Sequence, residues 1–241
     1  MGVSSIFFIT TYFSDYILVP AKNRIHVTKA LEKQGFVFEK HSDAFVVTHH
    51  RSTSASSVGS VPSTPLPTTI EELEAKTFAT LKRQNVVPSV NTETKLVLCA
   101  GRRRISRAGP SVRSDEIGLY LGLVRCLVAQ PEFLSVTLTN HESPSLLLQQ
   151  DMLPLFGFTD ALLGTKGDIL IPIVLDLREL PVESTGIVCG VAGRLVGRTG
   201  VSFGDASDSV QMSYLSTARA GTVMVAEEDI ERAIGALSLG F

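Results

Sequence analysis

The two ends of the chain carry a matching segment, and this internal repeat limits what the chain can fold into. The segment "TTYFSDYILVPAKN", which begins at Thr10, aligns without a gap over "STARAGTVMVAEED", which begins at Ser216. Thr11 then matches Thr217. Each copy alternates apolar and polar residues around a polar turn, and each is followed by a helical pattern that ends in Gly-Phe. The chain is therefore predicted to contain two related units, each a β-hairpin followed by a helix.

The second copy has more predicted structure in front of it. A strand over 168–177 and a helix over 187–196 precede the strands 211–216 and 222–225 and the helix 228–237. One more strand would complete the split-βαβ, ferredoxin-like arrangement, in which two helices cover one face of an antiparallel sheet. The first copy has only its hairpin, a helix that stops near Gly35 and an extended segment. On this interpretation the chain begins within a domain.

The remaining segments give a coarse organisation of the chain. Residues 51–69 are rich in Ser, Thr and Pro, which predicts a linker. Strands are predicted over 95–100, 133–138 and 145–148, and helices over 70–84 and 115–129. The second of these helices is expected to face inward with Ile117, Leu121, Val124, Leu127 and Val128. The predicted division is a partial domain over 1–50, the linker over 51–69, a middle region over 70–167 and a C-terminal domain over 168–241.

Composition excludes several functional classes. The net charge of -2 gives no overall basic field for nucleic acid or anionic lipid. The arginine-rich segment 101–113 lacks interleaved aromatic residues, so we interpret it as a loop, in which Ser106 is a candidate phosphorylation site. No apolar stretch reaches the roughly 20 residues of a membrane span, and no signal peptide is recognisable. We therefore expect a cytosolic protein with no nucleic-acid or membrane partner.

Catalytic and metal-binding motifs are also missing from the sequence. Cys99, Cys126 and Cys189 are far apart and lie beside no histidine cluster, which suits a reducing compartment and argues against structural zinc. His141 is interpreted as a solvated turn residue. There is no GxSxG, P-loop or GxGxxG between a strand and a helix. The expectation is a protein that is not an enzyme and has no cofactor or metal.

Three segments resemble a known family. "TTYFSDYILVP", "ESTGIVCGVAG" and "YLSTARAGTVMVAEEDIERAIGAL" resemble the CASTOR family of cytosolic arginine sensors, and "TNHESPSLLLQQDMLPLF" resembles its middle region more loosely. That family is built from tandem ACT domains. The resemblance implies an α+β fold of tandem ACT-like, ferredoxin-like βαββαβ domains, the first incomplete at its N-terminus.

The resemblance also implies a function and a site. It implies a non-catalytic sensor that binds a free amino acid between two ACT domains packed side by side, arginine in the well-studied members. The signal would pass to a regulatory protein complex upstream of TOR kinase. A helix N-terminus near Gly186 suits a ligand carboxylate, and a glycine there allows close approach to the backbone. The implied ligand-binding residues are Thr10, Thr11, Asp15, Ser184, Thr185, Gly186, Ile187, Ser216, Thr217 and Gly221.

One position departs from the family pattern. The family's C-terminal hairpin resembles "STFNFD", whose acidic residue helps to hold the ligand, whereas this chain has Gly221 at the matching position. A cationic ligand would lose an ion pair there, and Arg219 adds repulsion. The acid is kept in the first copy as Asp15, and Asp205 and Asp208 are further acidic candidates before the second hairpin.

Structural explanations stay open beside the functional ones. Thr10, Thr11 and Ser216 can be ordinary strand and turn residues, Gly186 can be a tight turn, and Asp15 can be a solvated turn residue. The first hypothesis is thus an amino-acid sensor. The second is an interaction module that kept the ACT scaffold and lost its ligand, and the third is an allosteric subunit of a biosynthetic enzyme. The incomplete first domain leaves an exposed sheet edge, which predicts a homo-oligomer.

Overall fold

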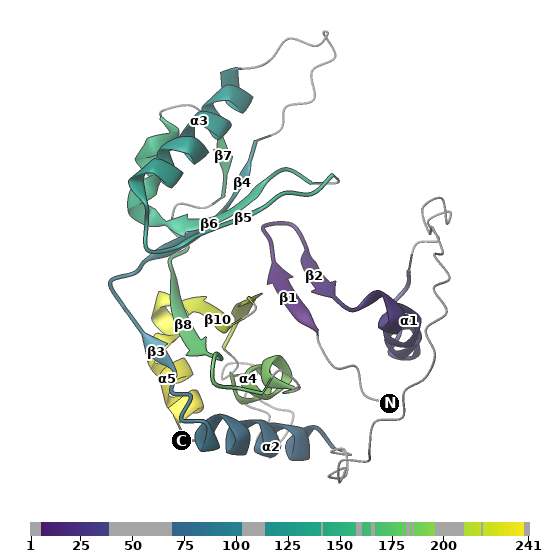
Figure 1. Cartoon of the computed structure of the whole chain (residues 1–241). Coiled ribbons are helices and arrows are strands. Elements are labelled where there is room, and N and C mark those ends of the chain that lie inside the picture. The colour runs from purple at the N-terminus through teal and green to yellow at the C-terminus, as the bar shows by residue number, and fades with distance from the viewer. Residues whose placement is uncertain are drawn as a thin grey trace.

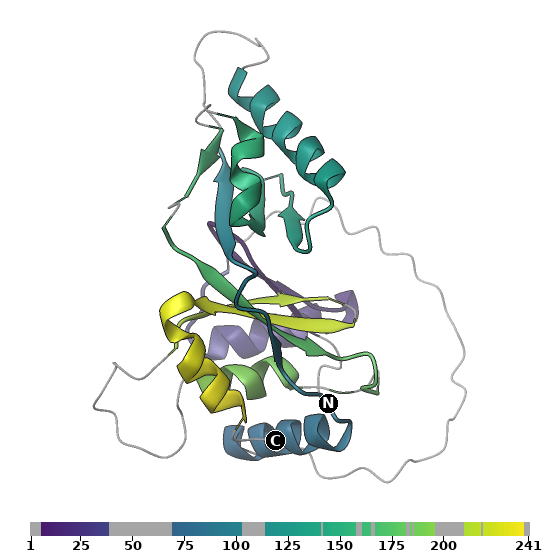
Figure 2. The same cartoon turned by 90° about the vertical axis from the view of Figure 1, so that its left-hand side faces the viewer.

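The computed structural model describes residues 6–38, 69–102, 114–140, 142–157, 161–164, 167–181, 184, 186–195, 210–217 and 219–238. Their strands join one sheet in the order β2-β1-β9-β10-β8-β4-β6-β5, with β3 beside β8 and β7 beside β4. The sheet curls (Figures 1 and 2). In the strand order the N-terminal hairpin lies at one end, the strands of the middle of the chain lie at the other, and the C-terminal strands lie between them.

The C-terminal end is a complete ferredoxin-like unit. Its elements are β8 (Leu170–Asp176), α4 (Ile187–Leu195), β9 (Met212–Ser216), β10 (Ala220–Ala226) and α5 (Ile230–Ser238). The strand β3 (Ser89–Val90) pairs antiparallel with β8 and supplies the fourth strand. The order β3-β8-β10-β9, all antiparallel, is that of the split-βαβ arrangement. The α+β, ferredoxin-like expectation is therefore confirmed for this unit.

The middle of the chain repeats this topology. Its elements are β4 (Leu96–Gly101), α3 (Ser114–Ala129), β5 (Leu134–Thr137), β6 (Ser145–Gln149), the 3-10 segment η2 (Gln150–Phe156) and β7 (Leu162–Leu163). The strand order is β7-β4-β6-β5, again antiparallel, with η2 in the place of the second helix. Leu96 of β4 pairs with Leu170 of β8, and the buried side chains of Leu96, Leu147 and Met224 pack between the two units.

The N-terminal hairpin confirms the internal repeat in detail. It consists of β1 (Phe7–Thr10) and β2 (Asp15–Leu18), followed by η1 (Ala21–Asn23) and α1 (Arg24–Lys33). Thr10 pairs with Asp15 as the matching Ser216 pairs with Gly221. The turn η1 likewise matches η4 (Glu227–Asp229) before α5. The two copies thus share register as well as element order.

The prediction for the inward face of α3 is wrong. Ile117, Leu121, Val124, Leu127 and Val128 are between 45% and 78% exposed, whereas Leu119 and Cys126 are buried against β4 and β6. The helix is apolar on more than one side, so periodicity alone does not identify the packed face. The packed face is the one with Gly122, where a Cβ would lie 2.3 Å from the Phe156 ring.

The helices α4 and α2 (Ile70–Arg83) contact each other through small residues. Cβ atoms built at Gly186, Gly190 and Gly193 would meet Leu73, Thr77 and Glu74 of α2 at 2.7, 2.8 and 2.9 Å. Figure 2 shows α2 lying beside α4, on the side away from the sheet. The glycines at 190 and 193 thus permit the two helices to pack closely. Beside them, Arg194 forms an ion pair with Glu74 at 2.6 Å and stacks 4.2 Å from the Phe78 ring centroid.

The first prediction concerns this contact. Gly190→Ala should lower the free energy of unfolding by about 1–3 kcal/mol, because the added methyl group would overlap Thr77. The matched control is Gly235→Ala in α5, where a Cβ meets nothing within 4 Å. That change should raise stability by about 0.5–1 kcal/mol through helix propensity. Urea unfolding of both variants tests the difference, and equal effects would contradict the tight contact.

Candidate functional site

The two hairpins meet through strands β1 and β9. These strands pair antiparallel at Ile9 and Leu215, which are matching positions of the repeat. The Phe8 N–H donates to Ser216 Oγ at 3.1 Å, and the matching Tyr214 N–H donates to Thr10 Oγ1 at 3.3 Å. A local two-fold axis at the junction thus relates one hairpin to the other.

The hydroxyls of Thr11 and Thr217 form hydrogen bonds within their own turns. Thr11 Oγ1 donates to Ser14 O at 2.7 Å and accepts from Ser14 N–H at 3.0 Å. Thr217 Oγ1 makes the same pair of bonds with Ala220, at 3.0 and 3.0 Å. Because β1 and β9 run antiparallel, the two turns point away from each other. The structure therefore does not bring Thr11 and Thr217 together.

The first turn is held by the middle unit. Glu142 accepts a hydrogen bond from the Ser14 hydroxyl and lies 3.4 Å from Thr11 Oγ1. Ser145 Oγ accepts from the Tyr12 N–H at 2.9 Å. The expected site residue Asp15 is exposed and follows this turn at the start of β2. Its carboxylate is the acid of the first hairpin.

The start of α4 holds a second group of predicted residues. Gly186 has φ +85°, a left-handed conformation that favours glycine. Its backbone is approached by α2, because Thr77 Oγ1 donates to Gly186 O at 3.3 Å. The Ser184 N–H donates to Pro181 O at 2.8 Å, and Ile187 begins the helix. Thr185 lies outside the described residues, as do Ser106, His141, Asp205 and Asp208.

A buried aromatic residue lies in the core between the first hairpin and α4. Tyr214 is buried in the cluster against which Phe8 and Ile187 also pack. A Cβ built at Gly221 would lie 2.1 Å from Tyr214 Oη. In the C-terminal hairpin, the Tyr214 hydroxyl therefore fills the space beside Gly221 where the family pattern has an acidic side chain. Burial raises the pKa of Tyr214 to about 12, because desolvation disfavours the charged phenolate.

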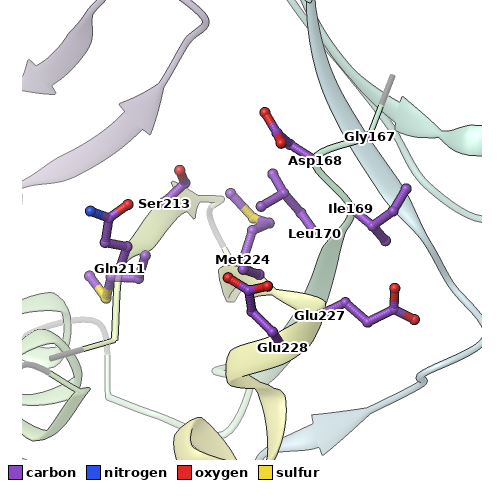
Figure 3. Close-up of a pocket in the computed structure, with 11 residues that line it drawn as sticks. Gly167, Asp168, Ile169, Leu170, Gln211, Ser213, Met224, Glu227 and Glu228 are labelled. Carbon is purple, nitrogen blue, oxygen red and sulfur yellow. The ribbon is translucent and has the colours of Figure 1, made fainter. Parts of the chain in front are cut away.

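An open cleft lies elsewhere on the C-terminal unit, and none of the predicted site residues lines it. Its volume is about 750 Å³, within the range of ligand pockets. Figure 3 shows Met224 and Leu170 in it, with carboxylates at Asp168, Glu227 and Glu228. Glu227 forms an ion pair with Lys95 at 2.8 Å. Sequence reasoning missed this cleft because it joins residues 167–170, 211–213 and 224–228, whose proximity no local pattern indicates.

Two further findings concern the described part of the chain. None of its helices is both long and apolar enough to cross a bilayer. Nor do its His, Cys, Asp and Glu side chains converge in any group of three that could hold a metal ion.

Comparisons with known proteins give weak structural likenesses. No protein-family model and no curated protein matches the chain. It is similar to a protein of unknown function from Vibrio cholerae, at 14% identity over 70% of this chain and 93% of that one, with a TM-score of 0.40. It is also similar to the regulatory subunit of aspartate kinase from Thermus flavus, at 11% identity over 65% and 96%, with a TM-score of 0.38.

A third likeness is to E. coli aspartokinase III in complex with lysine and aspartate. The identity is 15% over 63% of this chain and 31% of that one, and the TM-score is 0.30. The ferredoxin-like assignment itself rests on the strand order described above.

The second prediction follows from the buried phenol. The folded state holds the Tyr214 proton more tightly than the unfolded chain, whose tyrosines have pKa values near 10. This contribution to stability is complete below about pH 10 and is lost as the pH rises toward about 12. Urea unfolding between pH 8 and 11 should therefore show a steeper loss of stability for the unsubstituted chain than for Tyr214→Phe. Parallel losses would contradict the assignment.

Proposed function

We propose that the chain is a non-catalytic regulatory protein of the CASTOR type, which binds a free amino acid and signals through a changed protein contact. The observation that supports this most is the hairpin junction. Two matching units lie side by side across β1 and β9, with reciprocal hydrogen bonds between Phe8 and Ser216 and between Tyr214 and Thr10. The family resemblance implies a ligand between two domains paired in this manner.

The start of α4 is the proposed carboxylate-binding end of the site. The first N–H groups of a helix have no partner within the helix, and the helix dipole favours an anion there. Ser184, Thr185, Gly186 and Ile187 form this end. In the proposed site the ligand is arginine or another amino acid. The proposed protein partner is the regulatory complex upstream of TOR kinase, in the cytoplasm.

The third prediction tests ligand binding. A thermal-shift screen against the twenty amino acids should raise the melting temperature with at least one of them, because a ligand that binds only the folded state stabilises it by mass action. Thr185→Ala should lower the affinity of the chain for that ligand about tenfold, equivalent to ~1.4 kcal/mol of binding free energy. The control is Thr80→Ala on α2, whose exposed hydroxyl bonds to its own helix. A folded chain that responds to no amino acid would contradict the sensor.

The apolar face of α3 favours the interaction module as a second candidate. Ile117, Leu121, Val124 and Val128 are spaced by four, three and four residues, the seam of a coiled-coil helix pair. Tyr120 and Leu127 extend the same exposed surface. Arg125 lies outside it, because its guanidinium donates to Leu155 O at 3.2 Å.

The occupant that fits this face is a second copy of the chain. The seam carries no charge, so two copies related by a two-fold axis would meet without like-charge repulsion. Six side chains that are 45–78% exposed offer on the order of 500 Å² on each copy. Two such faces would bury roughly 1,000 Å², the lower end of a specific interface.

The fourth prediction tests this dimer. Light scattering coupled to gel filtration should give a dimer for the unsubstituted chain at micromolar concentration and a monomer for Val124→Glu, because the carboxylate would be desolvated in the seam. The matched control is Val87→Glu, since Val87 is similarly exposed (59% against 55%) but lies outside α3. An unsubstituted chain that is monomeric, or equal behaviour of the two variants, would overturn the proposal.

A further inference from the structure

The two copies of the hairpin differ in what lies beside them. In the second copy, β10 lies between β9 and β8. Within the part of the chain that the structure describes, the matching strand β2 pairs with β1 alone and ends the sheet. The free edge of a strand presents unpaired backbone N–H and C=O groups, which are a template for a further strand. The repeat thus indicates where such a strand would lie, namely as β8 lies on β10.

The same place is open at the level of side chains. Val223 of β10 is 0% exposed, whereas the matching Ile17 of β2 is 43% exposed. The helix α5 buries two of its residues and α1 buries none. In the second copy, Ile173 and Leu175 of β8 and Val191 of α4 belong to the same buried cluster as Val223. The first copy therefore has the apolar face of the unit without the strand that covers it.

The charge at one end of this edge differs between the copies. Asp168 comes just before β8 and lines the same cleft as Glu227 and Glu228 (Figure 3). The matching positions of the first copy are Ala21 and Lys22. A strand that lay on β2 as β8 lies on β10 would bring its N-terminal end to Lys22. An acidic residue there would meet a cation instead of two carboxylates, which favours one direction and one register of the added strand.

We propose that the free edge of β2 is a docking site for an extended segment of a different protein, which adds an antiparallel strand to the sheet. The segment has apolar residues at alternate positions, facing Ile17, and an acidic residue just before them, facing Lys22. In this mode of recognition, main-chain hydrogen bonds supply the affinity and the alternate side chains supply the specificity. The edge lies at the opposite end of the sheet from β5, so it stays free in a dimer formed through α3.

The experiment uses a synthetic peptide with the sequence of residues 167–177, GDILIPIVLDL, which contains β8 and is labelled at its C-terminus. Fluorescence anisotropy should show saturable binding to the full unsubstituted chain. Ile17→Asp should lower the affinity at least about tenfold, because a carboxylate would be buried against the apolar side of the peptide. The matched control is Ile25→Asp on α1. Ile25 is 62% exposed and matches the exposed Glu231, so this variant should bind as the unsubstituted chain does.

A charge exchange tests the direction of the added strand. A peptide with Asp168→Lys should bind the unsubstituted chain more weakly than the original peptide, because its lysine would meet Lys22. The chain variant Lys22→Glu should reverse this order of the two peptides. Lys22 is exposed, so this variant keeps the test decisive even if Ile17→Asp fails to fold.

Four results would overturn the proposal. They are no saturable binding by the folded unsubstituted chain, equal effects of Ile17→Asp and Ile25→Asp, binding that neither Ile17→Asp nor the charge exchange alters, and a dimer of the unsubstituted chain that Ile17→Asp alone converts to a monomer. The third result would place the peptide elsewhere, for example on β10 in exchange for β8. The fourth would assign the edge to a second copy of the chain.

Discussion

The strand β8 is the element on which the rest of the structure depends. One edge pairs with β10 along its whole length, and the other edge pairs first with β4 at Leu170 and then with β3 at Ile173 and Val174. Pro172, which has no N–H to donate, falls between these two partners. The C-terminal unit is built on this strand, and the middle unit joins it through the pair of Leu96 with Leu170. Leu96, Leu147 and Met224 pack where the two units meet. Loss of β8 would separate the middle unit from the strands β10, β9, β1 and β2.

Much of the fold could be predicted from the sequence because its signals are local. The hairpins, their shared register, and the helices α2, α4 and α5 follow from alternation, small residues and turn chemistry. The strand β3 could not be predicted, since it has only two residues and pairs with a strand more than eighty positions away. The packed face of α3 was predicted wrongly because that helix is apolar on several sides, and its contacts with β4, β6 and Phe156 decide between them.

The candidate site was less predictable than the fold. The sequence identifies residues with hydroxyl groups at both hairpins. In the structure these hydroxyls form hydrogen bonds with backbone groups, at Thr10, Thr11, Ser216 and Thr217. Gly221 is recognisable as a departure from the family pattern. The structural reason for a glycine there is Tyr214, seven residues earlier on the facing strand, whose hydroxyl would lie 2.1 Å from a Cβ at position 221. Side-chain packing of this kind leaves no periodic signal.

The position of β3 has a consequence for how the chain folds during synthesis. The middle unit, from β4 to β7, is made between β3 and β8, which are partners in the C-terminal unit. Its strands and its helix are complete before β8 leaves the ribosome, so it can fold first. The C-terminal unit instead needs segments from both sides of that insertion, and its sheet closes only after β10 is made. The apolar face of the helix α2, which packs on α4 in the folded chain, therefore stays exposed until α4 has been synthesised. During that interval it is a hydrophobic surface to which chaperones of nascent chains can bind.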